Sequence, residues 1–275
     1  RCKTARVENF DSACALIELP DGSFSWDVPD GWHVGRGAWG GLVAGALVRA
    51  VTAREDERAR VVRSVSAEFA APARVGPHTI TATRLRRGST LSTWNVVAVD
   101  GEGGPVARLT AVVAEARPSA ADIDVSSWGM LQPPPAPDAA DVPVVAIEPP
   151  LGPEFGRQVE FRPVTGLPYS GPSARALGYV RLKDPVPHTA ASLLGLVDAW
   201  WPATLAMLDR VRPIATVNFS ANLMVDPATI AADELLLYEG TAAGAADGFT
   251  SEQRRLWAAD GRLVVDNLQS IVLIA

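Results

Sequence analysis

Most of the chain alternates apolar and polar residues, as antiparallel strands do, and two apolar stretches with helical spacing interrupt this pattern. The first, GGLVAGALVRAVTARE, predicts a helix from Gly40 to Glu55, and its paired glycines permit a close approach where the helix starts. The second, TAASLLGLVDAWWPATLAMLDR, predicts a longer helix from Thr189 to Arg210. Four alternating segments, parted by Gly and Pro turns, follow each helix. They span residues 61–73, 78–88, 91–101 and 105–116, and then 214–225, 234–245, 249–261 and 262–275.

A proline-rich segment that neither a helix nor a central strand tolerates separates these two sets of elements. It predicts an N-terminal unit of residues 1–117, a linker of residues 118–157 and a C-terminal unit of residues 158–275. Extended segments also precede both helices, at residues 15–29 and 159–184. The order of elements therefore repeats, and it predicts an α+β protein in which one long apolar helix is wrapped by an antiparallel sheet, twice.

Charge and composition exclude several classes of partner. The 275 residues carry a formal net charge of −6, whereas nucleic acids and anionic membrane surfaces require a cationic face. The sequence has neither an apolar run long enough to span a membrane nor a signal-peptide pattern, so we expect a cytoplasmic protein. Two cysteines, Cys2 and Cys14, and three scattered histidines are too few for a disulfide framework or a usual metal site. The abundance of Ala, Arg, Gly and Pro suits a GC-rich bacterial genome.

Asp198 stands out because it interrupts the apolar face of the second predicted helix. Burying a carboxylate without partners costs at least several kcal/mol, so hydrogen bonds or water must compensate it. Pro202 lacks an N–H group and cannot bond the carbonyl of Asp198, which predicts a kink or a freed acceptor there. The alternative is an acid at the end of a helix that faces solvent.

Several short segments, in this order along the chain, resemble the double-hotdog acyl-CoA thioesterases of the TesB-like (acyl-CoA thioesterase II) family. They are GAWGGLVAGALVRA, LVDAWWPA, IATVNFSAN, LLLY and DGRLVVDNLQSIVLI. The resemblance covers nearly the whole chain apart from the linker. It implies a double hotdog fold and hydrolysis of an acyl-CoA or acyl-carrier thioester by direct attack of water, as part of lipid metabolism.

The resemblance also implies which residues do the chemistry. In the family an Asp of the second helix, a Thr or Ser of the next strand and a Gln of the last strand hold the attacking water; the matching residues are Asp198, Thr216 and Gln269. In the first half the helical stretch GGLVAGALVRA has no acid, and Thr110 or Ala111 falls where a Gln would. A single active site, mainly in the second half, follows. Without the resemblance, Thr216 reads as an ordinary strand residue and Gln269 as an amide that satisfies a backbone bulge.

Other candidates are substrate-binding residues with ordinary structural alternatives. Gly40 and Gly41 favour close helix packing, although amides at a helix N-terminus are also suited to receive the thioester oxygen. Trp39 is a candidate wall of a pocket. Arg86 and Arg87 are candidates for the phosphates of coenzyme A, whereas arginines in turns are usually only solvated.

Two rival functions stay open at this stage. A hotdog acyl-CoA hydratase or dehydratase needs an Asp and a His about five residues apart, a spacing that the chain lacks. A non-catalytic acyl-CoA-binding protein would keep the fold and lose the chemistry. A G-x-S-x-G elbow is missing, which disfavours a Ser-His-Asp hydrolase. We expect no cofactor and no metal, and by analogy with hotdog assemblies a homodimer or higher homo-oligomer.

Overall fold

The computed structural model describes residues 9–57, 59–117, 131–210 and 212–274. Its first half holds α1 (Phe10–Ala13), β1 (Ile17–Glu18), β2 (Phe24–Val28), β3 (His33–Val34), β4 (Gly37–Ala38), α2 (Gly40–Arg54), β5 (Arg60–Phe69), β6 (Gly76–Arg87), β7 (Leu91–Asp100) and β8 (Pro105–Glu115). The second half holds β9 (Val159–Thr165), β10 (Arg175–Leu182), α3 (Ala190–Asp198), β11 (Ile214–Leu223), β12 (Leu236–Ala246), β13 (Phe249–Trp257) and β14 (Leu263–Leu273). Short 3-10 turns lie at Ala139–Asp141, Glu154–Gln158, Ala203–Met207 and Pro227–Thr229.

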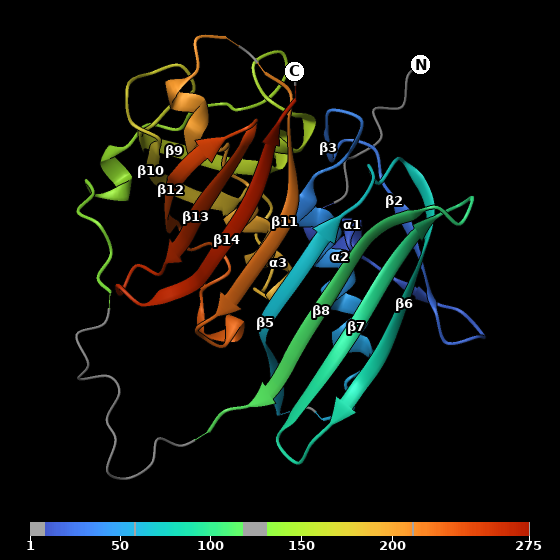
Figure 1. The fold of residues 1–275 in the computed structure, drawn as a ribbon. Coiled ribbons are helices and arrows are strands. Elements are labelled where there is room, and N and C mark those ends of the chain that lie inside the picture. The colour runs from blue at the N-terminus through green and yellow to red at the C-terminus, as the bar shows by residue number, and fades with distance from the viewer. Residues whose placement is uncertain (1–8, 58, 118–130, 211, 275) are drawn as a thin grey trace, which may run out of the picture.

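Twelve of the described strands form one antiparallel sheet in the order β1-β2-β6-β7-β8-β5-β11-β14-β13-β12-β10-β9. The two halves meet where β5 pairs with β11 (Figure 1). On one side of that junction the order β5-β8-β7-β6-β2 repeats as β11-β14-β13-β12-β10 on the other. The α+β class, the antiparallel sheet and the four strands after each helix are confirmed.

The register shows that the repeat extends to individual residues. The β5/β8 pairing shifts between Val62 and Ser64, and the β11/β14 pairing shifts between Thr216 and Asn218. Each bulge therefore lies at the same step of its ladder, because the hydrogen-bonded serines Ser66 and Ser220 pair with each other at the junction. Residues of the two halves can be matched strand by strand from these bulges.

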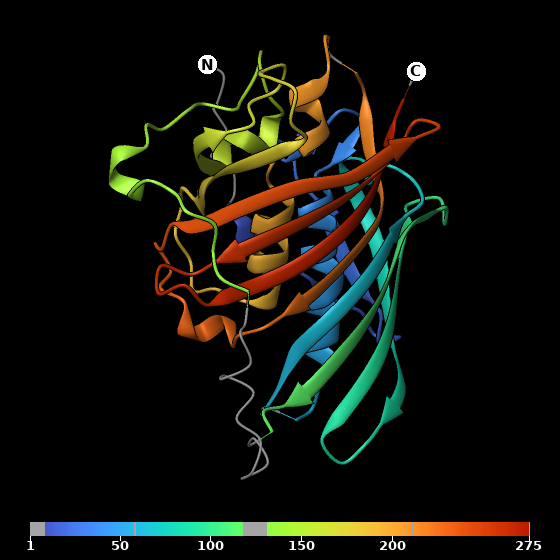
Figure 2. The same cartoon turned by 60° about the vertical axis from the view of Figure 1, so that its left-hand side comes forward.

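The helices α2 and α3 lie side by side inside the curve of the sheet (Figure 2). α2 contacts β5 to β8, whereas α3 contacts β10, β13 and β14. Leu42, Leu47 and Leu194 are fully buried between these layers, and burying each such side chain stabilises the fold by about 1.5–3 kcal/mol. The two helices approach closely where Gly41 has no side chain. A Cβ there would lie 2.9 Å from the Cα of Gly195. Gly41 thus permits close packing between the two helices, whereas the glycine pair predicted close packing of a helix against the sheet.

The second helix is shorter than the sequence pattern predicts. α3 begins after the N-cap Thr189, whose side chain forms a capping box with Ser192, but it ends at Asp198 rather than at Arg210. Pro202 explains the end, since it has no N–H to bond the Asp198 carbonyl. That freed carbonyl accepts a hydrogen bond of 3.2 Å from Trp39 Nε1 instead.

Residues 118–130 of the predicted linker lie outside the described residues. The cysteine at position 2 does as well. From residue 131 onward the segment packs against the second half: Arg162 Nη1 donates to the carbonyls of Ala139 and Val142, and Val145 bridges to Phe161. Cys14 is buried as a free thiol. In the part of the chain that the structure describes, no helix has the length and hydropathy needed to cross a membrane.

Candidate active site

Asp198, Thr216 and Gln269 lie together in one hydrogen-bonded chain. Gln269 Nε2 donates to Asp198 Oδ1 over 2.8 Å, and Thr216 Oγ1 donates to Gln269 Oε1 over 3.0 Å. The three side chains come from the end of α3, from β11 and from β14, which are far apart in sequence. Asp198 and Gln269 are buried, whereas Thr216 is half-buried. The chain of groups thus runs from the interior toward the surface.

A second set of contacts fixes the Gln269 amide. The other hydrogen of Nε2 points to Asn267 Oδ1 at 3.0 Å, and Asn267 Nδ2 donates to the carbonyl of Ser220 at 2.8 Å. Both N–H hydrogens of the amide and one lone pair of its oxygen are therefore used. Such a network holds the donor aimed at Asp198 without rearrangement.

Burial dominates the electrostatics of Asp198, and several partners oppose it only in part. Burial raises the pKa of its carboxyl group above the ordinary value, while Arg254, the Gln269 amide, the backbone N–H of Gly41 and Trp39 act in the opposite direction. Gly41 lies in the first turn of α2, so the positive end of that helix also favours a negative charge at this place. The carboxylate that the sequence pattern left unexplained is therefore compensated by hydrogen bonds and charge.

Sequence reasoning missed two buried charged residues beside Asp198. Arg254 Nη1 lies 3.5 Å from Asp198 Oδ1, and Arg254 Nε donates to Glu252 Oε1 over 2.8 Å. Both residues are buried on the inward face of β13, in phase with the core residue Leu256. The signal in the sequence is this period of two, which places Glu252 and Arg254 on the same side as Leu256.

Gly40, Gly41 and Trp39 border the acid from the first half. A Cβ on Gly40 would come within 3.1 Å of Asp198 Oδ2 and 3.6 Å of the Phe69 ring, so the absence of a side chain lets the start of α2 approach that oxygen closely. Trp39 is buried and stacks on Phe155 with ring centroids 4.5 Å apart. Its indole donates to the Asp198 carbonyl and does not form the wall of an open pocket.

The structure does not bring Arg86 and Arg87 to Asp198. Both lie at the end of β6, and Arg87 forms ion pairs with Asp56 and Glu57, which follow the C-terminus of α2. Gly40 and Asp198 lie at the other end of α2, about 20 Å away for a helix of this length. Arg86 is exposed and Arg87 is already paired with acids, which weakens both as partners of this site.

The first half carries apolar residues at the positions that match the site. In the register set by the two bulges, Thr216 corresponds to Val62 and Gln269 to Ala111, because Val65 pairs with Ala111 as Phe219 pairs with Gln269. Val62 and Ala111 are buried core residues. Of the two alternatives predicted for the Gln position, Ala111 is the one that the structure selects.

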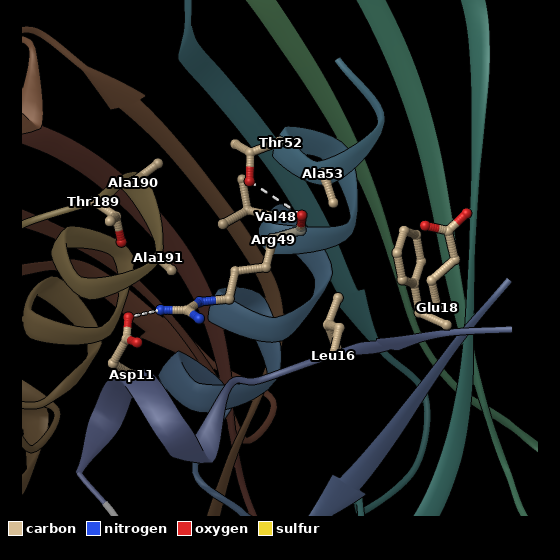
Figure 3. A pocket seen from close by; sticks show the side chains of 11 residues that line it. Asp11, Leu16, Glu18, Val48, Arg49, Thr52, Ala53, Thr189, Ala190 and Ala191 are labelled. Carbon is tan, nitrogen blue, oxygen red and sulfur yellow. Dashed lines mark hydrogen bonds and ion pairs between the residues drawn. The ribbon is translucent and has the colours of Figure 1, made fainter. Parts of the chain in front are cut away.

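A cavity in the described residues lies elsewhere. It has a volume of about 580 Å³ and is lined by Arg49 and Thr52 of α2, by Leu16 and Phe24, and by the start of α3 (Figure 3). Its Ala191 wall is seven residues before Asp198, or roughly 10 Å along the helix. Arg49 is turned toward Asp11 there (Figure 3). None of the three site residues lines this cavity.

Two family models match the sequence. The model for the acyl-CoA thioesterase C-terminal domain matches residues 131–273, and the model for the acyl-CoA thioesterase N-terminal domain matches residues 28–114. No curated protein matches the chain. Together the two models cover both halves of the repeat, and the C-terminal one begins at residue 131, inside the predicted linker.

Solved structures share the fold over nearly the full length. A conserved hot dog protein of unknown function from Alicyclobacillus acidocaldarius is 26% identical with a TM-score of 0.85, covering 97% of this chain and 98% of that one. A candidate thioesterase II from Thermobifida fusca is 25% identical with a TM-score of 0.79, covering 97% of both chains. The acyl-CoA thioesterase II TesB2 of Mycobacterium marinum, at 19% identity, TM-score 0.75 and coverages of 96% and 98%, supports the fold alone. Since the C-terminal model alone spans more than half of the sequence, the chain belongs to the acyl-CoA thioesterase family, is TesB-like, and is a thioesterase with a hotdog fold.

Proposed function

We propose that this thioesterase hydrolyses acyl-CoA or acyl-carrier thioesters by direct attack of a water molecule that Asp198, Thr216 and Gln269 hold. The observation that carries the proposal is the hydrogen-bonded chain from Thr216 through Gln269 to a buried Asp198. A carboxylate, an amide and a hydroxyl can together hold a water and accept its proton, which thioester hydrolysis requires.

Asp198 acts as the base. Its Oδ1 is engaged by Gln269 and Arg254, whereas its Oδ2 faces Gly40 at the start of α2. The water oxygen bonds to the thioester carbonyl carbon while its proton passes to Asp198. The carbon–sulfur bond then breaks, and the thiol leaves with that proton, so that free acid and thiol are released and Asp198 is ionised again.

The architecture that we propose around this reaction is a double hotdog with boundaries at 1–117, 118–157 and 158–275. The repeated strand order on the two sides of the β5/β11 junction supports it. The single active site belongs to the second unit, since Val62 and Ala111 replace its polar residues in the first. The chemistry needs no metal or redox cofactor, and coenzyme A enters only as part of the substrate.

The setting of the enzyme is also part of the proposal. We expect it to act in the cytoplasm on lipid-derived acyl groups, without nucleic acid or membrane partners, and as a homodimer or higher homo-oligomer. Hotdog sheets leave exposed edge strands, which favours pairing between copies. Sedimentation of the full chain measures this directly.

The test is steady-state release of free thiol from acyl-CoAs of short to long chain length. Wild type is expected to turn over at least one of them, and Asp198→Asn to lose about a hundredfold or more in kcat. Asp209→Asn, an exposed acid of the following loop, serves as the matched control and should retain activity. If wild type hydrolyses no acyl-CoA or acyl-carrier substrate, yet acyl-CoA raises its Tm, the non-catalytic binding function replaces this proposal.

A further inference from the structure

The pair Glu252 and Arg254 is the one buried cluster of charge in contact with Asp198 that the proposed reaction leaves unused, within the described part of the chain. Arg254 is only 2% exposed, and the side chain of Glu252 is fully buried. Two charges in a strand interior are costly unless they serve each other or a third group. Arg254 reaches two groups outside its own strand, the carboxylate of Asp198 and the carbonyl of Trp200.

The repeat supplies an independent observation. β13 pairs with β14 as β7 pairs with β8, and Glu252 opposite Gln269 corresponds to Trp94 opposite Ala111. Two residues further along, Arg254 corresponds to Val96. Trp94 and Val96 are buried core residues. The same fold is thus built with an apolar pair in the half that has Val62 and Ala111 in place of Thr216 and Gln269, so the framework itself does not require charge at these two positions.

Geometry shows what the charges do in the second half. Arg254 Nη1 and Gln269 Nε2 both point to Oδ1 of Asp198, which fixes the carboxylate with Oδ2 turned toward Gly40. Glu252 holds the guanidinium through Nε and also accepts the Ala203 N–H at 2.7 Å. The pair therefore ties the chain after α3 to β13 and aims one positive charge at the acid.

We propose that Arg254, oriented by Glu252, is a positioning residue that keeps the Asp198 carboxylate ionised and in a single orientation for its role as base. This inference rests on the proposed function of Asp198. The ionisable groups that face Arg254 are Asp198 from α3, Tyr238 from β12 and Glu252 from β13. Burial alone lowers the pKa of Arg254, but these three neighbours raise it above its ordinary value, so the guanidinium stays charged.

The charges predict opposite effects for the two partners. In Arg254→Gln the acid limb of the kcat/KM profile should move to higher pH by about one unit or more, because an opposite charge within 4–6 Å typically lowers the pKa of a carboxyl group by one to three units. In Glu252→Gln the amide oxygen can still accept the Arg254 Nε–H, so Arg254 stays oriented while one anion is removed, and the same limb should move to lower pH. Arg254→Lys should keep the limb near its wild-type position. Arg255→Gln is the matched control, because Arg255 lies on the outer face of β13 with Asp266.

A purely structural role gives a different result. If both variants lose the same fraction of activity at every pH, or if both move the limb in the same direction, the proposal is wrong. Should Arg254→Gln fail to fold because Glu252 is left unpaired, the double variant Arg254→Gln/Glu252→Gln removes both charges. Its limb must still lie above that of wild type, because Arg254 is the nearer charge.

A second measurement needs no substrate and separates this inference from the proposed function. In a double-mutant cycle of unfolding free energies with Arg254→Gln and Asp198→Asn, we expect a favourable coupling that grows as the pH rises and Asp198 ionises. Coupling that is absent between pH 5 and pH 9 overturns the inference even if the enzyme is active. Coupling in a protein that hydrolyses no thioester overturns the proposed function alone.

Discussion

Gln269→Met tests how far the amide network supports ionisation of Asp198. Methionine has a similar length but no polar amide, so the change removes the 2.8 Å donor to Asp198 Oδ1 and the 3.0 Å acceptor of Thr216 Oγ1. The ion pair with Arg254 at 3.5 Å remains. Asp198 therefore keeps its nearby positive charge and loses its shortest side-chain hydrogen bond.

The size of the effect follows from that bond. A hydrogen bond to a charged group contributes about 1.5–3 kcal/mol, and about 1.4 kcal/mol corresponds to one pKa unit. Since Gln269 donates to the ionised form, its loss raises the pKa of Asp198 further, by about one to two units. The base works only when ionised, so the acid limb of kcat/KM should move upward by the same amount. Below the wild-type limb the rate should fall by about tenfold to a hundredfold.

The assay is thiol release from the best acyl-CoA of the panel between pH 5 and pH 9, with thermal unfolding at each pH as a check of folding. Gln253→Met is the matched control, because Gln253 also donates an amide hydrogen to a carboxylate, Asp266, but on the outer face of β13. It should leave the profile unchanged. A Gln269→Met enzyme whose acid limb coincides with that of wild type would refute the reasoning, whatever its rate at the plateau.

Two further predictions concern Thr216 and the contact between the helices. Thr216→Val should cost no more than about 1.5 kcal/mol of stability, the range for a neutral hydrogen bond, yet lower kcat/KM by about tenfold to a hundredfold, whereas Thr216→Ser should stay close to wild type; equal rates for Val and Ser would contradict a role of the hydroxyl. Gly41→Ala places a Cβ 2.6 Å from the Trp39 ring and 2.9 Å from the Gly195 Cα, so Tm should fall by a few degrees, as overpacking of about 1–3 kcal/mol implies. Gly171→Ala, with no atom within 4 Å of the added Cβ, should leave Tm unchanged, and equal Tm values for the two variants would count against close helix packing.

Much of the fold could be predicted from local pattern alone. The period of two marks the eight strands that follow the helices, because their inner faces are packed and their outer faces are solvated. The helix from Gly40 is also predicted to within a residue of its end. The second helix was predicted too long because Leu205 and neighbouring apolar residues continue the helical spacing past Pro202, where the backbone instead forms a 3-10 turn.

Some residues of the candidate site could likewise be predicted from the sequence and others could not. Asp198, Thr216 and Gln269 were found through the resemblance to a family, since nothing in their spacing predicts that α3, β11 and β14 meet. Arg254 was overlooked because QRRLW places two arginines together, and only the inward phase of β13 separates the buried Arg254 from the half-exposed Arg255. Arg86 and Arg87 were candidates by charge, yet the acidic partners of Arg87 follow α2, a contact that sequence order does not reveal.

The two halves of the molecule contribute different things to one reaction site. All the ionisable and amide side chains around the Asp198 carboxylate come from the second half, on α3, β13 and β14. The first half supplies the Trp39 indole, the Gly41 N–H and the close approach at Gly40. Because α3 ends at Asp198, its last residue needs exactly such partners from outside the helix. A C-terminal half alone would therefore keep Asp198, Thr216 and Gln269 and lose the N-terminus of α2 that faces the carboxylate, so the proposed site depends on both halves.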